Sequence, residues 1–164
     1  MRMSRDAGSR GGPVAPAVAL AFAVVGFVAL AIAGLGLTSL ILDADVIPTP
    51  GLGQIPGAIG MLLATGGFAA ALWFGLRAEH PTFWTALGTA VCAYLGEIVG
   101  VAFGAVISGS GPAAGFAAAG GVAIGWPGAV IAGAGLVAGW GGIALVRTRA
   151  GRPRWPWERD EDER

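Results

Sequence analysis

Four long apolar blocks constrain the fold of this 164-residue chain more than any other feature of its sequence. Each block has about 20 residues or more, which is the length that a helix needs to cross the hydrocarbon core of a bilayer. Charged residues make up only 12% of the chain, whereas soluble domains carry about 25%, so a soluble globular protein is excluded. The sequence predicts an all-α integral membrane protein, a four-helix transmembrane bundle with spans at about residues 14–42, 57–76, 82–107 and 127–146.

The spans divide the chain into three parts. Residues 1–13 are polar and glycine-rich and are expected to form a disordered tail, residues 14–147 form the transmembrane domain, and residues 148–164 form a second tail. The first apolar block is far longer than the roughly 7–15 apolar residues of a signal peptide. We therefore interpret it as a retained span.

Residues 109–126 leave three alternatives open, because Pro127 interrupts a long apolar run within the turn-like stretch GWPG. These residues form an outer connector, a segment that re-enters the membrane, or an extension of one long kinked helix. The last alternative is included because membrane helices tolerate proline and glycine.

Arginine sets the predicted orientation. All ten basic residues are arginines, and they lie in the first tail, in the loop after the second span, and at or beyond the end of the fourth span. Basic residues close to membrane ends stay in the cytoplasm. The sequence therefore predicts that both termini are cytoplasmic.

Glu97, in the stretch YLGEIVG, is the only acidic residue within the four predicted spans. It lies about 15 residues from Thr82, or roughly 22 Å along a helix, which places it in the outer third of a hydrocarbon core about 30 Å thick. The small residues Gly100 and Gly104 lie on its side of the helix, whereas bulky residues such as Trp84 lie on the opposite side. Because small residues favour close helix packing, Glu97 is expected to point into the bundle.

The role of this carboxylate has two interpretations. A charge within hydrocarbon costs about 3 kcal/mol on insertion scales, so we expect Glu97 to be neutral much of the time. It either couples to protons or cations, or it is a structural group that hydrogen-bonds to neighbouring helices or contacts the outer water. Candidate hydrogen-bonding partners are Tyr94 on the same span and Thr38, Ser39 and Thr65 on other spans.

Small residues recur at every fourth position on three of the spans. Such rows let two helix backbones approach each other closely. They serve either packing within one chain, which we favour, or homodimerisation. The rows are Gly67, Ala71 and Gly75 on the second span, Gly96, Gly100 and Gly104 on the third, and Gly135 and Gly139 on the fourth.

The end of the chain combines arginine and tryptophan. Aromatic rings prefer the level of the lipid headgroups, and anionic lipid attracts each arginine near the surface by about 1 kcal/mol. A membrane-interface anchor is predicted, with a docking motif for a cytoplasmic partner as the alternative. Its residues are Arg147, Arg149, Arg152, Arg154, Trp155 and Trp157.

Motifs of soluble enzymes are missing from the sequence. It has no phosphate-binding loop, no HExxH and no GxSxG, and we expect neither enzymatic activity nor a cofactor. Asp43 and Asp45 form a DxD pair without histidine or cysteine nearby, so no metal site is predicted. The expected contacts are the lipid bilayer and either a homo-oligomer or another membrane protein, and no nucleic acid.

The four-span layout of the whole chain and the RPRWPWER end at Arg152 to Arg159 resemble uncharacterised four-span membrane proteins of actinobacteria, which are classed as domains of unknown function. The resemblance implies a location in the bacterial plasma membrane and no particular activity. We expect a small multi-pass membrane protein that acts as a structural or accessory subunit. The alternative is a proton- or cation-coupled small-molecule transporter that uses Glu97.

Overall fold

The computed structural model describes residues 14–47, 52–78 and 82–147, and the described chain is helical. Four of its helices are long and apolar enough to cross a membrane, so the predicted all-α fold with four spanning helices is confirmed. The two predicted tails lie outside the described residues. The helices are α1 (Pro16–Leu42), α2 (Ile55–Arg77), α3 (Trp84–Ile107), the shorter α4 (Gly111–Ile124) and α5 (Trp126–Arg147).

Proline lies in the first turn of four helices. α1, α2 and α4 each carry one there, and Pro127 is the second residue of α5. A proline fits this position because the N–H groups of the first turn have no acceptor within the helix. Pro56 accordingly allows α2 to begin at Ile55, two residues before the sequence-based estimate of 57.

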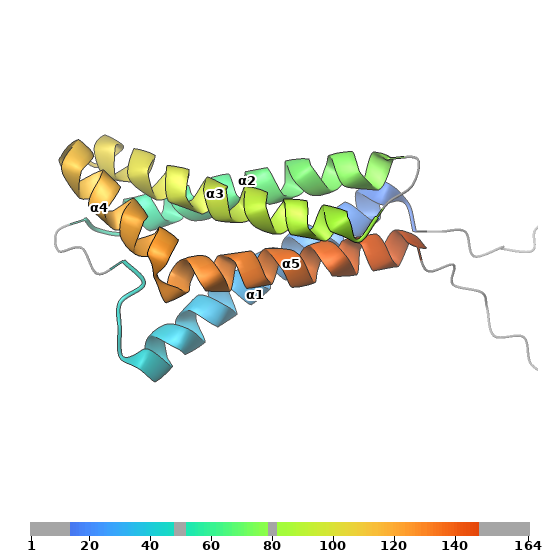
Figure 1. The fold of residues 1–164 in the computed structure, drawn as a ribbon, viewed down its shortest axis with the longest axis horizontal. Helices are drawn as coiled ribbons and strands as arrows, with labels where there is room; N and C mark the ends of the chain where they lie inside the picture. Colours follow the sequence, from blue (N-terminus) through green and yellow to red (C-terminus); the bar gives the residue numbers. More distant parts are fainter. Residues whose placement is uncertain (1–13, 48–51, 79–81, 148–164) are drawn as a thin grey trace, which may run out of the picture.

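The helices form a bundle (Figure 1). α2 and α3 lie side by side along their length, and α5 packs against both α3 and α1. We call the end of the bundle with Arg77 and Arg147 the arginine end, and the end with Asp43 and Ser108 the loop end. Toward the loop end α1 diverges from the other helices (Figure 1), and the side chain of Leu40 near its end is 79% exposed.

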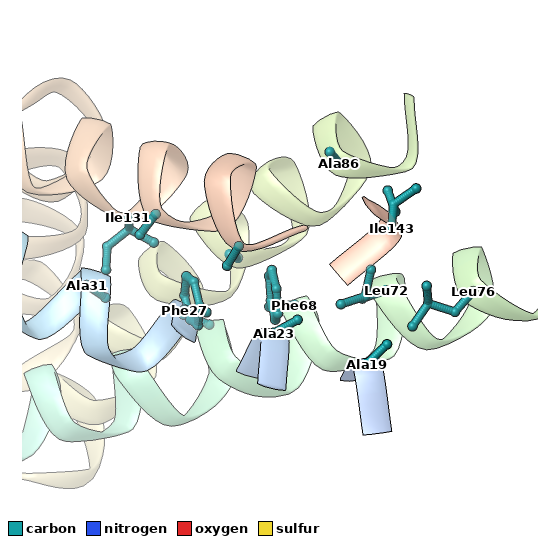
Figure 2. Packing of buried hydrophobic residues seen from close by; sticks show 14 residues of the cluster. Ala19, Ala23, Phe27, Ala31, Phe68, Leu72, Leu76, Ala86, Ile131 and Ile143 are labelled. Carbon is teal, nitrogen blue, oxygen red and sulfur yellow. The ribbon is translucent and has the colours of Figure 1, made fainter. Parts of the chain in front are cut away.

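The main apolar core lies between α1, α2 and α5 (Figure 2). At its centre the rings of Phe27 and Phe68 stack with their centroids 4.7 Å apart. Large side chains of α2 and α5, such as Leu72 and Ile131, fill the space around them. α3 contributes alanines to this core, because its backbone lies too close to its neighbours for larger residues. Large apolar side chains on the outside of the bundle, such as Phe74, suit contact with lipid.

The segment between the third and fourth spans forms α4, a helix that lies along α3. A Cβ atom at Gly115 would lie 2.9 Å from the carbonyl oxygen of Ala102, and Ala123 further along α4 meets Tyr94, which is earlier in α3. α4 therefore runs antiparallel to the half of α3 near the loop end. The chain then breaks at Gly125, which has extended geometry (φ −86°, ψ 175°). α5 continues along the other half of α3, where Gly135 faces Ala90. α4 and α5 together therefore cover α3 as two helices rather than as one kinked helix or as a loop.

The orientation of the bundle stays a prediction and is directly testable. In a Cys92→Ser background, we expect a membrane-impermeant thiol reagent to label Asp45→Cys and not Ala78→Cys in intact cells. Both positions are exposed, one at each end of the bundle, and basic residues stay cytoplasmic. Labelling of Ala78→Cys alone would reverse the predicted topology.

Candidate carboxylate site within the helix bundle

Glu97 of α3 is buried, with 5% of its surface exposed, and it lies opposite Gly60 of α2. A Cβ atom at position 60 would lie 2.8 Å from Oε1 of Glu97 and 2.9 Å from Cγ2 of Val101. Both distances are well below van der Waals contact, so a larger residue at position 60 would displace the carboxyl group. We call this arrangement the Glu97–Gly60 contact. The carboxyl group fits against α2 because Gly60 has no side chain.

Two apolar clusters flank this contact along α3. Ala93, one turn toward the arginine end, belongs to the main core. Val101, one turn toward the loop end, belongs to a smaller cluster that we call the loop-end cluster. The carboxyl group is thus enclosed by apolar side chains in both directions along the bundle. The buried members of the loop-end cluster are Leu52, Val101, Ala105, Ala118 and Val122.

The carboxyl group has no polar partner for one of its oxygens. Oε2 is buried and accepts no hydrogen bond from any described residue. The basic side chains in the described part of the chain are Arg77 and Arg147, and both lie at the arginine end. Arg77 packs over the ring of Trp73 at 4.1 Å, and Arg147 over that of Phe83 at 4.8 Å. A buried acid without a cationic partner is costly to keep within a membrane span.

Tyr94, the candidate partner on the same span, does not bind Glu97. Its hydroxyl donates a hydrogen bond to the carbonyl oxygen of Ala123 in α4 at 2.8 Å. Three residues turn a helix by about 300°, so the two side chains point about 60° apart; Tyr94 contacts α4 and Glu97 contacts α2. Two of the three candidate partners on other helices are engaged locally, since Thr65 donates to Met61 and Ser39 donates to Ala44; no hydrogen bond joins Thr38 to Glu97 among the described residues.

The bond of Tyr94 compensates for a proline. In a continuous helix the carbonyl of Ala123 would accept from the N–H of residue 127, four positions later. That residue is Pro127, which has no N–H. The hydroxyl of Tyr94 supplies the missing donor at the break between α4 and α5. Tyr94 therefore has a structural role that its sequence position alone did not reveal.

Tyr94→Phe is expected to destabilise the folded chain by about 1 kcal/mol, because the carbonyl of Ala123 loses its donor. Unfolding in SDS-containing mixed micelles, followed by tryptophan fluorescence, measures the change. Thr65→Val is the matched control, because the hydroxyl of Thr65 bonds only within its own helix. If both variants are equally stable, the break is not held by Tyr94.

The rows of small residues are used for packing within the chain. Along the α2–α3 contact, a Cβ atom at Gly96 would lie 2.6 Å from the carbonyl oxygen of Leu63, and one at Gly100 would lie 2.6 Å from Cα of Gly60. The remaining glycines of the rows follow the same pattern. Gly104 lies against Pro56, Gly67 against Cys92, Gly75 against Thr85, Gly135 against Ala90 and Gly139 against Thr89.

The sequence of the chain matches the model of a family of unknown function (DUF6121) over residues 9–164. The chain belongs to this family. No curated protein and no solved structure matches it. The DUF6121 match covers the four spanning helices, residues 9–15 before them and the segment after them up to residue 164, in agreement with the expected class of multi-pass membrane protein without assigned activity.

Two residues at the centre of this DUF6121 chain were not singled out from sequence. One is Gly60, whose role depends on the register between α2 and α3. The other is Thr89, which is completely buried and donates to the carbonyl oxygens of Ala86 at 2.7 Å and Gly135 at 3.3 Å. Its position three residues after Ala86 and four before Ala93 was the available signal, because that spacing places all three on one helix face.

Of the residues in the predicted interface anchor of the DUF6121 chain, only Arg147 lies within the described part of the structure. The ring of Phe83 contacts both Arg147 and Trp140, and its centroid is 6.0 Å from that of Trp140. These contacts place a cation beside aromatic rings at the arginine end, as an interfacial anchor requires. The other anchor residues, Arg149, Arg152, Arg154, Trp155 and Trp157, lie outside the described residues. Within the described part of the chain, no three metal-binding side chains cluster.

An apolar groove of about 360 Å³ opens at the break between α4 and α5. Tyr94 lines it, and Glu97 does not. The groove therefore lies beside the carboxylate site rather than within it. Its lining residues are Leu87, Ala90, Val91 and Tyr94 of α3, Ala123 and Ile124 of α4, Gly125, and Gly128, Ala129 and Ala132 of α5.

Proposed function

We propose that this DUF6121 protein is a proton-coupled membrane transporter of small molecules that works through Glu97, and that it is not an enzyme. The observation that supports the proposal is the unpaired, buried Oε2 of Glu97. A structural clamp offsets the cost of burying a carboxyl group by forming hydrogen bonds. No described residue provides such a bond to this oxygen, so a structural role accounts poorly for its position. Acids within spanning helices commonly act in proton relays.

The groove at the break between α4 and α5 supports the small-molecule part of the proposal. Transporters often bind their substrates where a membrane helix is interrupted, and binding sites commonly measure about 300–1,000 Å³. The groove has a volume of about 360 Å³ and an apolar lining. Tyr94, in its wall, is three residues from Glu97. A solute in the groove would therefore bind close to the proposed proton carrier.

Proteoliposomes with an imposed pH gradient test this proposal. We expect members of a panel of small organic cations, organic acids and neutral solutes to dissipate the gradient when the wild-type chain is present. Glu97→Gln keeps the size of the side chain and removes its titration, so the gradient should persist with this variant as it does in empty liposomes. Dissipation that survives Glu97→Gln would contradict the assignment of Glu97.

A structural or accessory subunit is the second candidate function, and the end of α1 favours it. A Cβ atom at Gly34 would still lie 2.7 Å from Val130 of α5. Beyond this point Leu37, Leu40 and Ile41 are at least 60% exposed. A helix end that leaves its own bundle offers an apolar surface to a helix of another membrane protein as well as to lipid.

Complementation separates the two candidates. The Glu97→Gln variant is expressed in a strain that lacks the wild-type chain. If the protein is an accessory subunit, the variant should restore the wild-type phenotype in full, because the surface of α1 is unchanged. If the protein is a proton-coupled transporter, the variant should not restore the phenotype. Membrane levels of both proteins, measured by immunoblot, control for loss of expression.

A further inference from the structure

We infer that the Glu97–Gly60 contact is a site for a proton and not for a metal cation. This inference rests on the proposed function and narrows it, because proton coupling and cation coupling would both use a carboxylate. Three features of the site carry the inference: its supply of oxygen ligands, its packing, and its surroundings.

The site has too few oxygen ligands for a metal ion. Calcium and magnesium require about six or more oxygens, and transporters that bind sodium draw on backbone carbonyls released where a helix unwinds. Among the described residues this site has one carboxyl group, and α2 and α3 continue unbroken through Gly60 and Glu97. The helix break in this region is at Gly125. The carbonyl of Ala123 beside that break already accepts a hydrogen bond from the hydroxyl of Tyr94.

The site is also closely packed where the carboxyl group meets α2. Oε1 would lie only 2.8 Å from a Cβ atom at Gly60, and Cγ2 of Val101 would lie 2.9 Å from the same atom. The space beside α2 therefore does not hold even a methyl group. The described groove lies at Tyr94 and does not include Glu97. A proton, in contrast, needs no volume beyond that of the carboxyl group.

The charges around the site favour the neutral form of the carboxyl group. α2 and α5 contribute Arg77 and Arg147, both at the arginine end, and α1 is followed by Asp43 at the loop end. α4 contributes no titratable residue, and on α3 itself Tyr94 faces α4 while Cys92 is exposed. No described group near Glu97 compensates a negative charge, so a bound proton removes the cost of burying that charge.

A hydrophobic carbodiimide reports the bound proton. The reagent reacts with a protonated carboxyl group: the acid proton moves to one carbodiimide nitrogen, and the carboxyl oxygen bonds to the central carbon. The acyl group then shifts to nitrogen, so the whole reagent is retained as a stable adduct. Mass spectrometry of wild-type protein in liposomes measures the fraction of Glu97 that carries it, and Glu97→Gln gives the background.

We expect labelling of Glu97 to fall about tenfold per pH unit above its midpoint, as for one titrating group. At fixed pH, replacing choline chloride with sodium, potassium or calcium chloride at constant ionic strength should leave labelling unchanged. Protection by one of these cations would overturn the proton-only inference while leaving Glu97 as a coupling residue. Labelling that does not change between about pH 4 and about pH 10 would overturn both the inference and the proposed function.

Discussion

Gly100→Leu is expected to prevent α2 from packing against α3 and to lower the stability of the fold by at least about 3 kcal/mol. A Cβ atom at position 100 would lie 2.6 Å from Cα of Gly60 and 2.8 Å from the carbonyl oxygen of Ile59. These are backbone atoms, which cannot rotate away as a side chain does. The helices would have to separate, and the Glu97–Gly60 contact would be lost with them.

Gly88→Leu is the matched control for this prediction. Gly88 lies on the same helix and is exposed, and a Cβ atom there would meet nothing within 4 Å. We expect its effect to stay within about 0.5 kcal/mol. Unfolding of the purified variants in SDS-containing mixed micelles measures both effects. Equal loss of stability in the two variants would show that close backbone contact does not determine how these helices pack.

Glu97→Met is expected to stabilise the fold by about 1–3 kcal/mol, which is the cost of burying a polar group without a hydrogen bond. Methionine is flexible and adapts to the irregular space beside Gly60. The same substitution removes the titratable group, so proton-coupled activity should disappear while stability rises. Opposite effects on stability and activity are characteristic of residues that are kept for function.

Thr89→Val provides the comparison for Glu97→Met. Thr89 is the other buried polar residue of the described chain, and its hydroxyl donates to Ala86 and Gly135. Removing this bonded hydroxyl should cost about 1 kcal/mol. If Glu97→Met were destabilising to the same extent as Thr89→Val, the carboxyl group would be a structural clamp and the proton-coupled proposal would fail.

The spanning helices were predictable because their signal is local. A run of about 20 apolar residues has one stable arrangement in a bilayer, since a helix satisfies every backbone polar group internally. The orientation of α3 was predictable for a similar reason, because small residues lie on one face of this helix and bulky residues on the other. The structure buries Ala86, Ala93 and Glu97 and exposes Trp84 and Val99.

The partners of the site residues were not predictable, because they depend on the register between helices. The pairing of Glu97 with Gly60 requires the relative position of α2 and α3 along their axes, which no local pattern specifies. The hydrogen bond of Tyr94 depends on where the chain breaks before Pro127. The sequence showed that this region was irregular, but its composition fits a connector, a re-entrant segment and a helix equally well.

The break between α4 and α5 makes the single tyrosine of this chain the counterpart of a proline 33 positions later. Selection should therefore act on the two positions jointly. In other members of DUF6121, a residue with an N–H group in place of Pro127 would relax the need for a hydroxyl at position 94, whereas members that keep the proline should keep a donor there. Aligned sequences of the family would show the dependence as paired substitutions, independently of any measurement of activity.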